Sequence, residues 1–137
     1  MVLHLIKLVV GLDTIEELEA WRKQAESREP VWKVRTRQTP KRADELVDGG
    51  SIYRVFKGAI LCRQTILAVD TVGEGRESRC EITVSEDVVR VAPVARRPFQ
   101  GWRYFEHKDA PPDLTGIDPE LAVPLDLARQ LRELGAW

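Results

Sequence analysis

Most of the chain between residues 31 and 105 is made of short segments in which apolar and polar side chains alternate. Alternation places successive side chains on opposite faces of a β-strand, and turn signals separate these segments every ~8–12 residues. This pattern predicts many short, mainly antiparallel strands in a strongly curved or barrel-like sheet. The expected strands cover residues 2–10, 31–37, 51–57, 59–70 and 79–84, with a shorter strand at 88–91 and an edge strand within 99–105.

Two further segments have helical spacing. Asp13 is a candidate N-cap with Glu16 three residues later, which predicts a helix over 14–28. A second helix is expected over 124–134, where leucines share one face.

A short helix is expected over 41–47, with Thr39 as its cap and Pro40 as its first residue. Lys57-Gly58 predicts a tight hairpin. The fold class predicted for the chain is α+β. We expect a single domain over 1–137, built as a curved, mainly antiparallel sheet or small pseudo-barrel with flanking helices.

Composition narrows the class of protein. The chain has 137 residues, a net charge of -1 and no apolar run of ~18 residues, so we expect no membrane span. His4 and Lys7 interrupt the apolar start, so we expect no signal peptide and a cytoplasmic protein. Cys62 and Cys80 are expected to be buried free thiols, with a single disulfide as the alternative.

No catalytic motif of the GxSxG, P-loop or GxGxxG type is present in the sequence. His4 is expected to be a hydrogen-bonded core residue, and His107 to lie in a solvated loop. With two histidines and two cysteines far apart in the chain, we expect no zinc site, no other metal and no cofactor. An enzyme is therefore the less favoured interpretation.

The charges are distributed in blocks. Residues 31–69 hold eight basic and three acidic side chains, and residues 90–108 hold five and one. The intervening residues 70–89 hold two basic and six acidic side chains. If the fold brings the two basic blocks together, they form a positive face on a nearly neutral protein; scattered solvated charge is the alternative.

Each basic block contains a candidate binding group. The first comprises Lys33, Arg35 and Arg37 on the outer face of one strand, continued by Lys41 and Arg42. Cations at a helix start favour an anion.

The second group interleaves arginines with aromatic rings, a combination that suits RNA because cations meet phosphate while rings stack on bases. It comprises Arg96, Arg97, Trp102, Arg103 and Tyr104. Tyr53 is a further candidate, although core packing explains it equally well.

Several segments resemble a bacterial family, domain-of-unknown-function family 1489, which is typical of alphaproteobacteria. They are LHLIKL (3–8), PKRADELVDGGSIY (40–53), KG (57–58) and RPFQGWRY (97–104). The resemblance spans nearly the whole chain and implies a bacterial cytosolic protein without an established activity.

The element order over 37–53 is also similar to that of PUA-like domains of the ASCH and EVE type, many of which bind RNA or modified bases. Some ASCH-type proteins are amidohydrolases that use a Lys, a Thr and a Glu. Lys33 and Thr36 have the matching spacing, but strand alternation puts them on opposite faces and no Glu matches.

We therefore predict a nucleic-acid-binding module for RNA or a modified base. The alternatives are an ASCH-like amidohydrolase acting on a modified nucleoside and a structural or partner-binding protein. The RNA hypothesis requires the two basic groups to lie around one cleft, with Trp102 or Tyr104 partly exposed at its rim.

Overall fold

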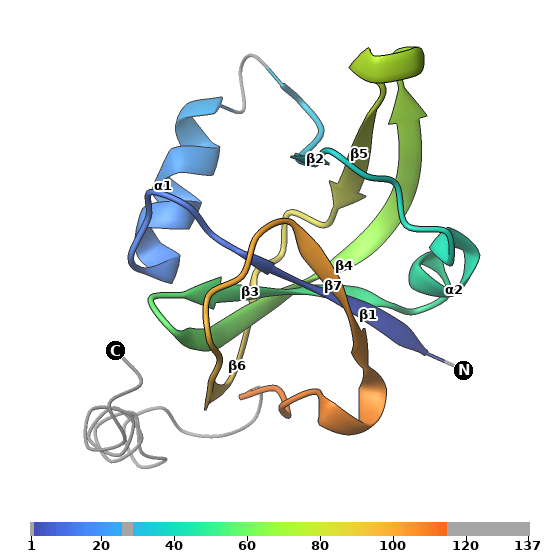
Figure 1. The fold of residues 1–137 in the computed structure, drawn as a ribbon. Coiled ribbons are helices and arrows are strands. Elements are labelled where there is room, and N and C mark those ends of the chain that lie inside the picture. Colours follow the sequence, from blue (N-terminus) through green and yellow to red (C-terminus); the bar gives the residue numbers. More distant parts are fainter. Residues whose placement is uncertain (1, 26–28, 115–137) are drawn as a thin grey trace.

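The computed structural model describes residues 2–25 and 29–114 (Figure 1). The helices and strands are β1 (Leu3–Leu8), α1 (Ile15–Ala25), β2 (Lys33–Thr36), α2 (Ala43–Val47), β3 (Ser51–Phe56), β4 (Ala59–Val72), β5 (Arg79–Val84), β6 (Val89–Ala95) and β7 (Trp102–Glu106). Two short 3₁₀ helices are η1 (Gly75–Glu77) and η2 (His107–Asp109). No helix within this described part is long and apolar enough to cross a bilayer.

The predicted α+β class with a curved, mainly antiparallel sheet is confirmed. The strand order is β2-β5-β4-β3-β1-β7, and β6 also pairs with β4. The pair β1–β3 is parallel, and the other pairs are antiparallel. The sheet does not close, so β2 and β7 are its two ends. The helix predicted over 124–134 lies outside the described residues.

The sixth strand is longer than predicted. We expected it over 88–91, but β6 continues through Pro93 to Ala95. Proline lacks the N–H that a strand ladder needs, so it is tolerated at irregular positions. The pairing of β4 with β6 shifts register between Ile60 and Cys62, and Pro93 lies at this irregularity.

The caps of both helices differ from the prediction. Thr14, not Asp13, caps α1: its hydroxyl accepts the Glu17 N–H at 3.1 Å, and Glu17 in turn accepts the Asp13 N–H. The cap and its glutamate thus lie one residue later than predicted, and Glu17 accepts the N–H of the residue before the cap, where a capping box would use the N–H of the cap itself. Thr39 does not cap α2, because its hydroxyl pairs with that of Thr71 at 2.7 Å.

The predicted hairpin at Lys57-Gly58 is confirmed. Both residues have positive φ, 43° and 86°, as a type I′ turn requires.

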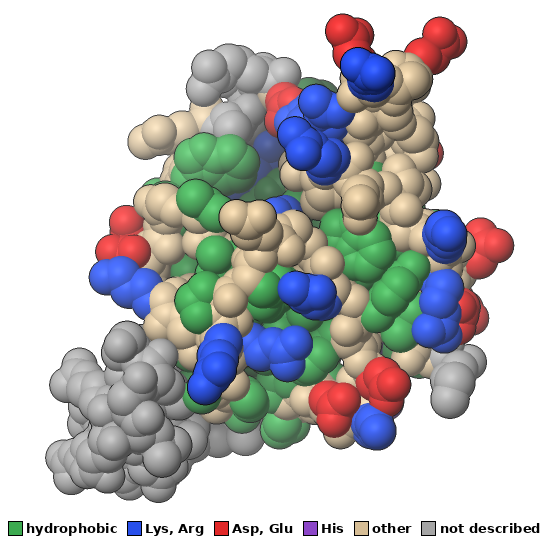
Figure 2. Space-filling view, viewed as in Figure 1, with side chains coloured by type: hydrophobic (Ala, Val, Ile, Leu, Met, Phe, Trp, Pro, Cys, Tyr) green, Lys and Arg blue, Asp and Glu red, His purple; other side chains and the backbone are tan. Residues whose placement is uncertain are grey.

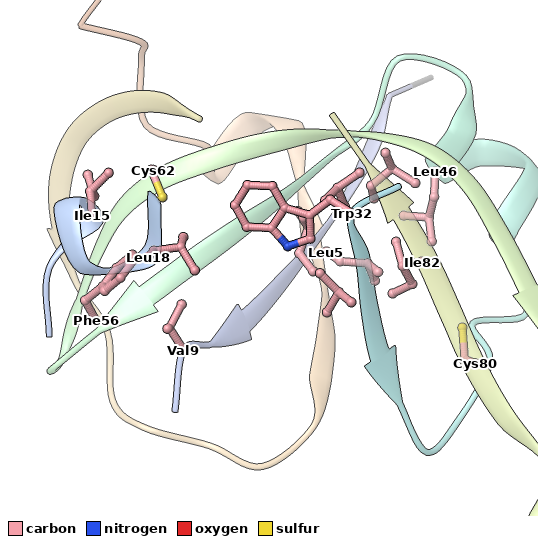
Figure 3. Packing of buried hydrophobic residues seen from close by; sticks show 14 of the residues in the cluster. Leu5, Val9, Ile15, Leu18, Trp32, Leu46, Phe56, Cys62, Cys80 and Ile82 are labelled. Atoms are coloured by element: carbon pink, nitrogen blue, oxygen red, sulfur yellow. The ribbon is translucent and has the colours of Figure 1, made fainter. Parts of the chain in front are cut away.

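The main core lies on the concave face of the curved sheet (Figure 3). β1 to β5 all direct apolar side chains into it, and both helices cover it. Its largest fully buried members include Phe56, Leu5, Ile52, Ile66 and Ile82. Each such side chain contributes roughly 1.5–3 kcal/mol through the hydrophobic effect. Cys62 and Cys80 lie in this core as free thiols, as predicted.

A second, smaller core lies on the opposite face of β1 and β3. It contains Ile6, Tyr53, Val55 and Phe105. The segment between β6 and β7 crosses this face and contributes Phe99 (Figure 1).

The prediction that His4 is a hydrogen-bonded core residue is confirmed, whereas the prediction for His107 is incomplete. His4 is 3% exposed, and its Nδ1 accepts the Ser51 N–H at 2.9 Å. His107 is not merely solvated, because its Nδ1 lies 3.0 Å from His4 Nε2. The neutral His4 ring therefore carries its proton on Nε2.

Gly50 is a steric constraint on the α2–β3 junction. A Cβ built there would lie 2.2 Å from the Leu3 carbonyl oxygen and 2.3 Å from that of Leu46. We expect Gly50→Ala to lower the free energy of unfolding by about 2 kcal/mol or more, because backbone atoms must move. Gly75→Asn is the control, since its left-handed position is open and should change stability by about 0.5 kcal/mol or less. Urea denaturation measures both, and equal losses would contradict this account.

The His4 ring gives stability a pH dependence. Burial, then the charge effects of His107 and Arg63, lower its pKa to about 4. The unfolded chain takes up this proton near pH 6.5, whereas the folded chain takes it up only near pH 4. The stabilisation given by the neutral His4 ring is therefore complete above about pH 6.5 and declines as the pH falls towards 4. Between these two pH values the free energy of unfolding changes by up to about 1.4 kcal/mol per pH unit.

His4→Asn keeps an acceptor for the Ser51 N–H and removes the titration. Urea denaturation between pH 7.5 and 4.5 should show a weaker pH dependence for this variant. Parallel curves for the variant and the native chain would refute the assignment.

Candidate nucleic-acid interface

The segment 37–42 bridges the two ends of the sheet. It leaves β2 and is held against β7 by two hydrogen bonds. The Trp102 indole N–H donates to the Gln38 carbonyl at 2.8 Å, and the Arg42 N–H donates to the Tyr104 hydroxyl at 3.1 Å. Of the first predicted group, Arg42 therefore meets the second group here.

Two aromatic rings form the centre of this contact. Trp102 and Tyr104 lie on one face of β7 with ring centroids 4.9 Å apart and an edge-to-face angle of 69°. The Arg42 guanidinium lies 5.6 Å from the Tyr104 ring centroid. Tyr104 is 36% exposed and Trp102 is half-buried, so the Tyr104 ring is the more accessible.

A second ring with cations lies on the other face of β7. Alternation directs Arg103 away from Trp102 and Tyr104, towards Phe99. The guanidinium carbons of Arg96 and Arg103 each lie 5.7 Å from the Phe99 centroid, within cation–π range. Figure 2 shows hydrophobic side chains on the face over β7, with Lys and Arg side chains on both sides of them.

We use the name β7 surface for the residues on the two faces of β7 and in the segments next to it. It comprises Lys41, Arg42, Arg96, Arg97, Phe99, Trp102, Arg103 and Tyr104. Arg37 instead lines a hollow beside β2 and β5, with Arg35, Arg79 and Glu81.

The β2 cations do not join the β7 surface. The Lys33 ammonium lies 3.1 Å from Glu81, and Arg35 bridges Glu81 at 3.0 Å and Glu29. These contacts lower the pKa of both carboxyl groups, chiefly through the hydrogen bonds from Lys33 to Glu81 and from Arg35 to Glu29. The charges of Lys33 and Arg35 are therefore largely neutralised within the protein.

Cations of the β7 surface have a different environment. Within residues 2–25 and 29–114, four of them form no ion pair. They are Lys41, Arg96, Arg97 and Arg103. Arg42 is the exception, since it pairs with Glu45 at 2.5 Å.

Tyr53 is corrected from a candidate ligand contact to a core residue. It is 4% exposed and packs between the rings of His4 and Phe105, at 5.1 and 5.2 Å. Its ring is not accessible for stacking on a base.

The structure does not bring together the Lys, Thr and Glu side chains that the amidohydrolase alternative requires. A glutamate does lie beside Lys33, namely Glu81. Thr36, however, is buried on the opposite face of β2, where its hydroxyl donates to the Gln38 carbonyl at 2.9 Å. Among the described residues no group of three or more His, Cys, Asp or Glu side chains is placed to hold a metal ion.

Sequence reasoning overlooked two parts of this surface. Phe99 is not among the predicted contact residues, yet its ring lies within cation–π range of two guanidinium groups. The Gln38 carbonyl has no sequence signal, because a backbone acceptor is recognised only when the fold brings a donor to it.

Comparison with known proteins gives one family match. A family model described as "Protein of unknown function (DUF1489)" matches residues 5–137. No curated protein and no solved structure matches.

The hydrogen bonds of Trp102 and Tyr104 should determine how firmly segment 37–42 is held in place. Tyr104→Phe removes the acceptor of the Arg42 N–H while keeping the ring, so the Arg42 amide should exchange with solvent faster. Trp102→Phe should accelerate exchange in the same segment by removing the bond to Gln38. Trp21→Phe is the control, because Trp21 packs on Trp32 instead. Amide hydrogen exchange followed by NMR measures the effect, and unchanged rates in both β7 variants would disprove it.

Proposed function

The chain belongs to the family described as protein of unknown function (DUF1489), and we propose that it is a nucleic-acid-binding module that takes RNA or a modified base on the β7 surface. The observation that carries this proposal is the contrast in charge pairing. Lys33 and Arg35 are each bound to carboxylates, whereas four cations of the β7 surface form no ion pair within the described chain.

Unpaired cations held close together repel one another. Arg96 and Arg103 both lie within cation–π range of the Phe99 ring, so two positive charges share this one ring. Two exposed charges at 4 Å cost about 1 kcal/mol in water. A phosphate backbone would remove this repulsion and release its own counterions on binding.

The rings supply the second element of the proposal. The Tyr104 ring is accessible and already carries Arg42 against it, an arrangement that favours stacking of a flat base. Single-stranded RNA fits these features better than a duplex does, because its bases can leave the helix and stack on side chains. Resemblance to PUA-like domains and a bacterial cytoplasmic setting belong to the same proposal.

Charge reversal on the β7 surface tests the proposal. Fluorescence anisotropy with a mixed-sequence single-stranded RNA should give a dissociation constant about tenfold or more weaker for Arg97→Glu/Arg103→Glu. The salt dependence of binding should become shallower by about one unit of slope for each phosphate that the variant no longer neutralises. Tyr104→Leu should weaken binding by about 1–3 kcal/mol, because it removes one stacking platform.

The control carries the same change in net charge at another place. Lys23→Glu/Arg76→Glu reverses two exposed cations on α1 and in η1, outside the β7 surface. Equal weakening by both double variants would reduce the effect to overall charge and reject the β7 surface. No binding by the native chain at about 50 mM salt would reject the function itself.

A further inference from the structure

Arg54 is a buried cation inside the curved sheet. It lies on β3 between the core residues Ile52 and Phe56 and is 7% exposed. One N–H of its guanidinium donates to the Gln64 side-chain oxygen at 3.1 Å. Its Nε is buried and has no hydrogen-bond partner within the described chain. A buried charge without a counterion is strongly unfavourable, so this position needs an explanation.

A second cation lies beside Arg54. Lys7 on β1 is paired in register with Arg54 on β3, so both side chains leave the same face of the sheet. Like charges on neighbouring strands destabilise a sheet. Burial, and then the charge of Arg54, lower the pKa of Lys7, and burial lowers that of Arg54 to about 10. Arg54 thus stays protonated at neutral pH.

No described side chain next to this pair supplies a compensating negative charge. On the other side of Arg54, its register partner on β4 is Cys62. Burial raises the pKa of the Cys62 thiol to about 12, so it stays neutral. The nearest acidic group on β5, Glu81, is already bound by Lys33 and Arg35.

The two cations face a cavity. It has a volume of about 290 Å³ and is lined by residues from the end of β1, from helix α1, from β2 and from β3. Figure 1 shows where these elements lie in the fold. Lys7 and Arg54 line one side, and Lys33 and Arg35 line another. The remaining walls are mainly apolar: Leu8, Leu18, Trp21, Trp32 and Val34. Figure 3 shows the side chains of Leu18, from α1, and of Trp32, which directly precedes β2, in the core.

We propose that this cavity is a binding site for a small organic anion, with Lys7 and Arg54 holding its phosphate or carboxylate group. The apolar walls fit a planar or aliphatic body, and the volume lies at the lower end for small-molecule sites. The bound anion supplies the missing charge between Lys7 and Arg54. This site is separate from the β7 surface and does not depend on RNA binding.

A purely structural role for Arg54 makes the opposite prediction. If Arg54 serves only to hold Gln64, its replacement by an apolar residue should destabilise the protein. If Arg54 is kept for an anion, Arg54→Met should leave the free protein equally stable or more stable, because removing an uncompensated buried charge is favourable. The same variant should lose the response to anions.

Thermal unfolding tests this with three probes: inorganic phosphate, benzoate and uridine monophosphate. Each is compared with sodium chloride at equal ionic strength, in a buffer free of phosphate and carboxylate. At least one probe should raise the melting temperature of the native chain saturably, since a ligand of the folded state stabilises it. Arg54→Met should raise the melting temperature of the free protein or leave it unchanged, and should abolish the shift. Comparison of the probes distinguishes a phosphate from a carboxylate ligand.

Two more variants keep the test decisive. Lys7→Met removes the less buried cation and should also abolish the shift, which covers the case in which Arg54→Met does not fold. Arg103→Met, on the β7 surface, should keep the full shift while weakening RNA binding. The proposal is overturned if no probe stabilises the native chain, if Lys7→Met and Arg103→Met respond alike, or if folded Arg54→Met keeps the response.

Discussion

The strand β4 determines the architecture, because it is hydrogen-bonded to three other strands. Its first half pairs with β3 and β6, and its second half pairs with β5. The partner changes where the register shifts between Ile66 and Ala68. An irregularity of this kind bends a strand, so side chains from both halves face one concave core. The curvature places Arg54 inside the sheet and leaves its ends, β2 and β7, near enough for segment 37–42 to join them.

An unclosed sheet must protect its terminal strands from pairing with other chains. On β7 the protection comes from Trp102 and Tyr104, whose hydrogen bonds hold segment 37–42 in place. Near β2, Arg22 of α1 binds Glu86 through two hydrogen bonds and lies 5.5 Å from the Trp32 ring centroid. Both ends therefore use cations and rings.

Local pattern predicted the strands well, because alternation is a property of neighbouring residues. The strand expected over 79–84 has the observed bounds, with Cys80, Ile82 and Val84 buried as alternation requires. Errors arose where two local signals competed. Asp13 and Thr14 are both good N-caps, and β6 continues through Pro93, which its register shift with β4 tolerates. The contact between His4 and His107 joins residues 103 positions apart, and no local pattern reports it.

The charge blocks show why a site needs a fold as well as a pattern. Alternation correctly placed Lys33 and Arg35 on one face, but Glu81 lies on the outer face of its own strand by the same rule. The antiparallel register of β2 and β5 sets Arg35 opposite Glu81, so the charge of this part of the basic block is paired within the sheet. Arg54 belongs to the same block of the sequence and lies inside the protein, beside Lys7 and without a carboxylate. One stretch of positive charge in the sequence thus supplies paired cations on β2, an unpaired cation beside β7 and the buried Arg54, which faces a cavity next to Lys7. These are three environments with different chemistry.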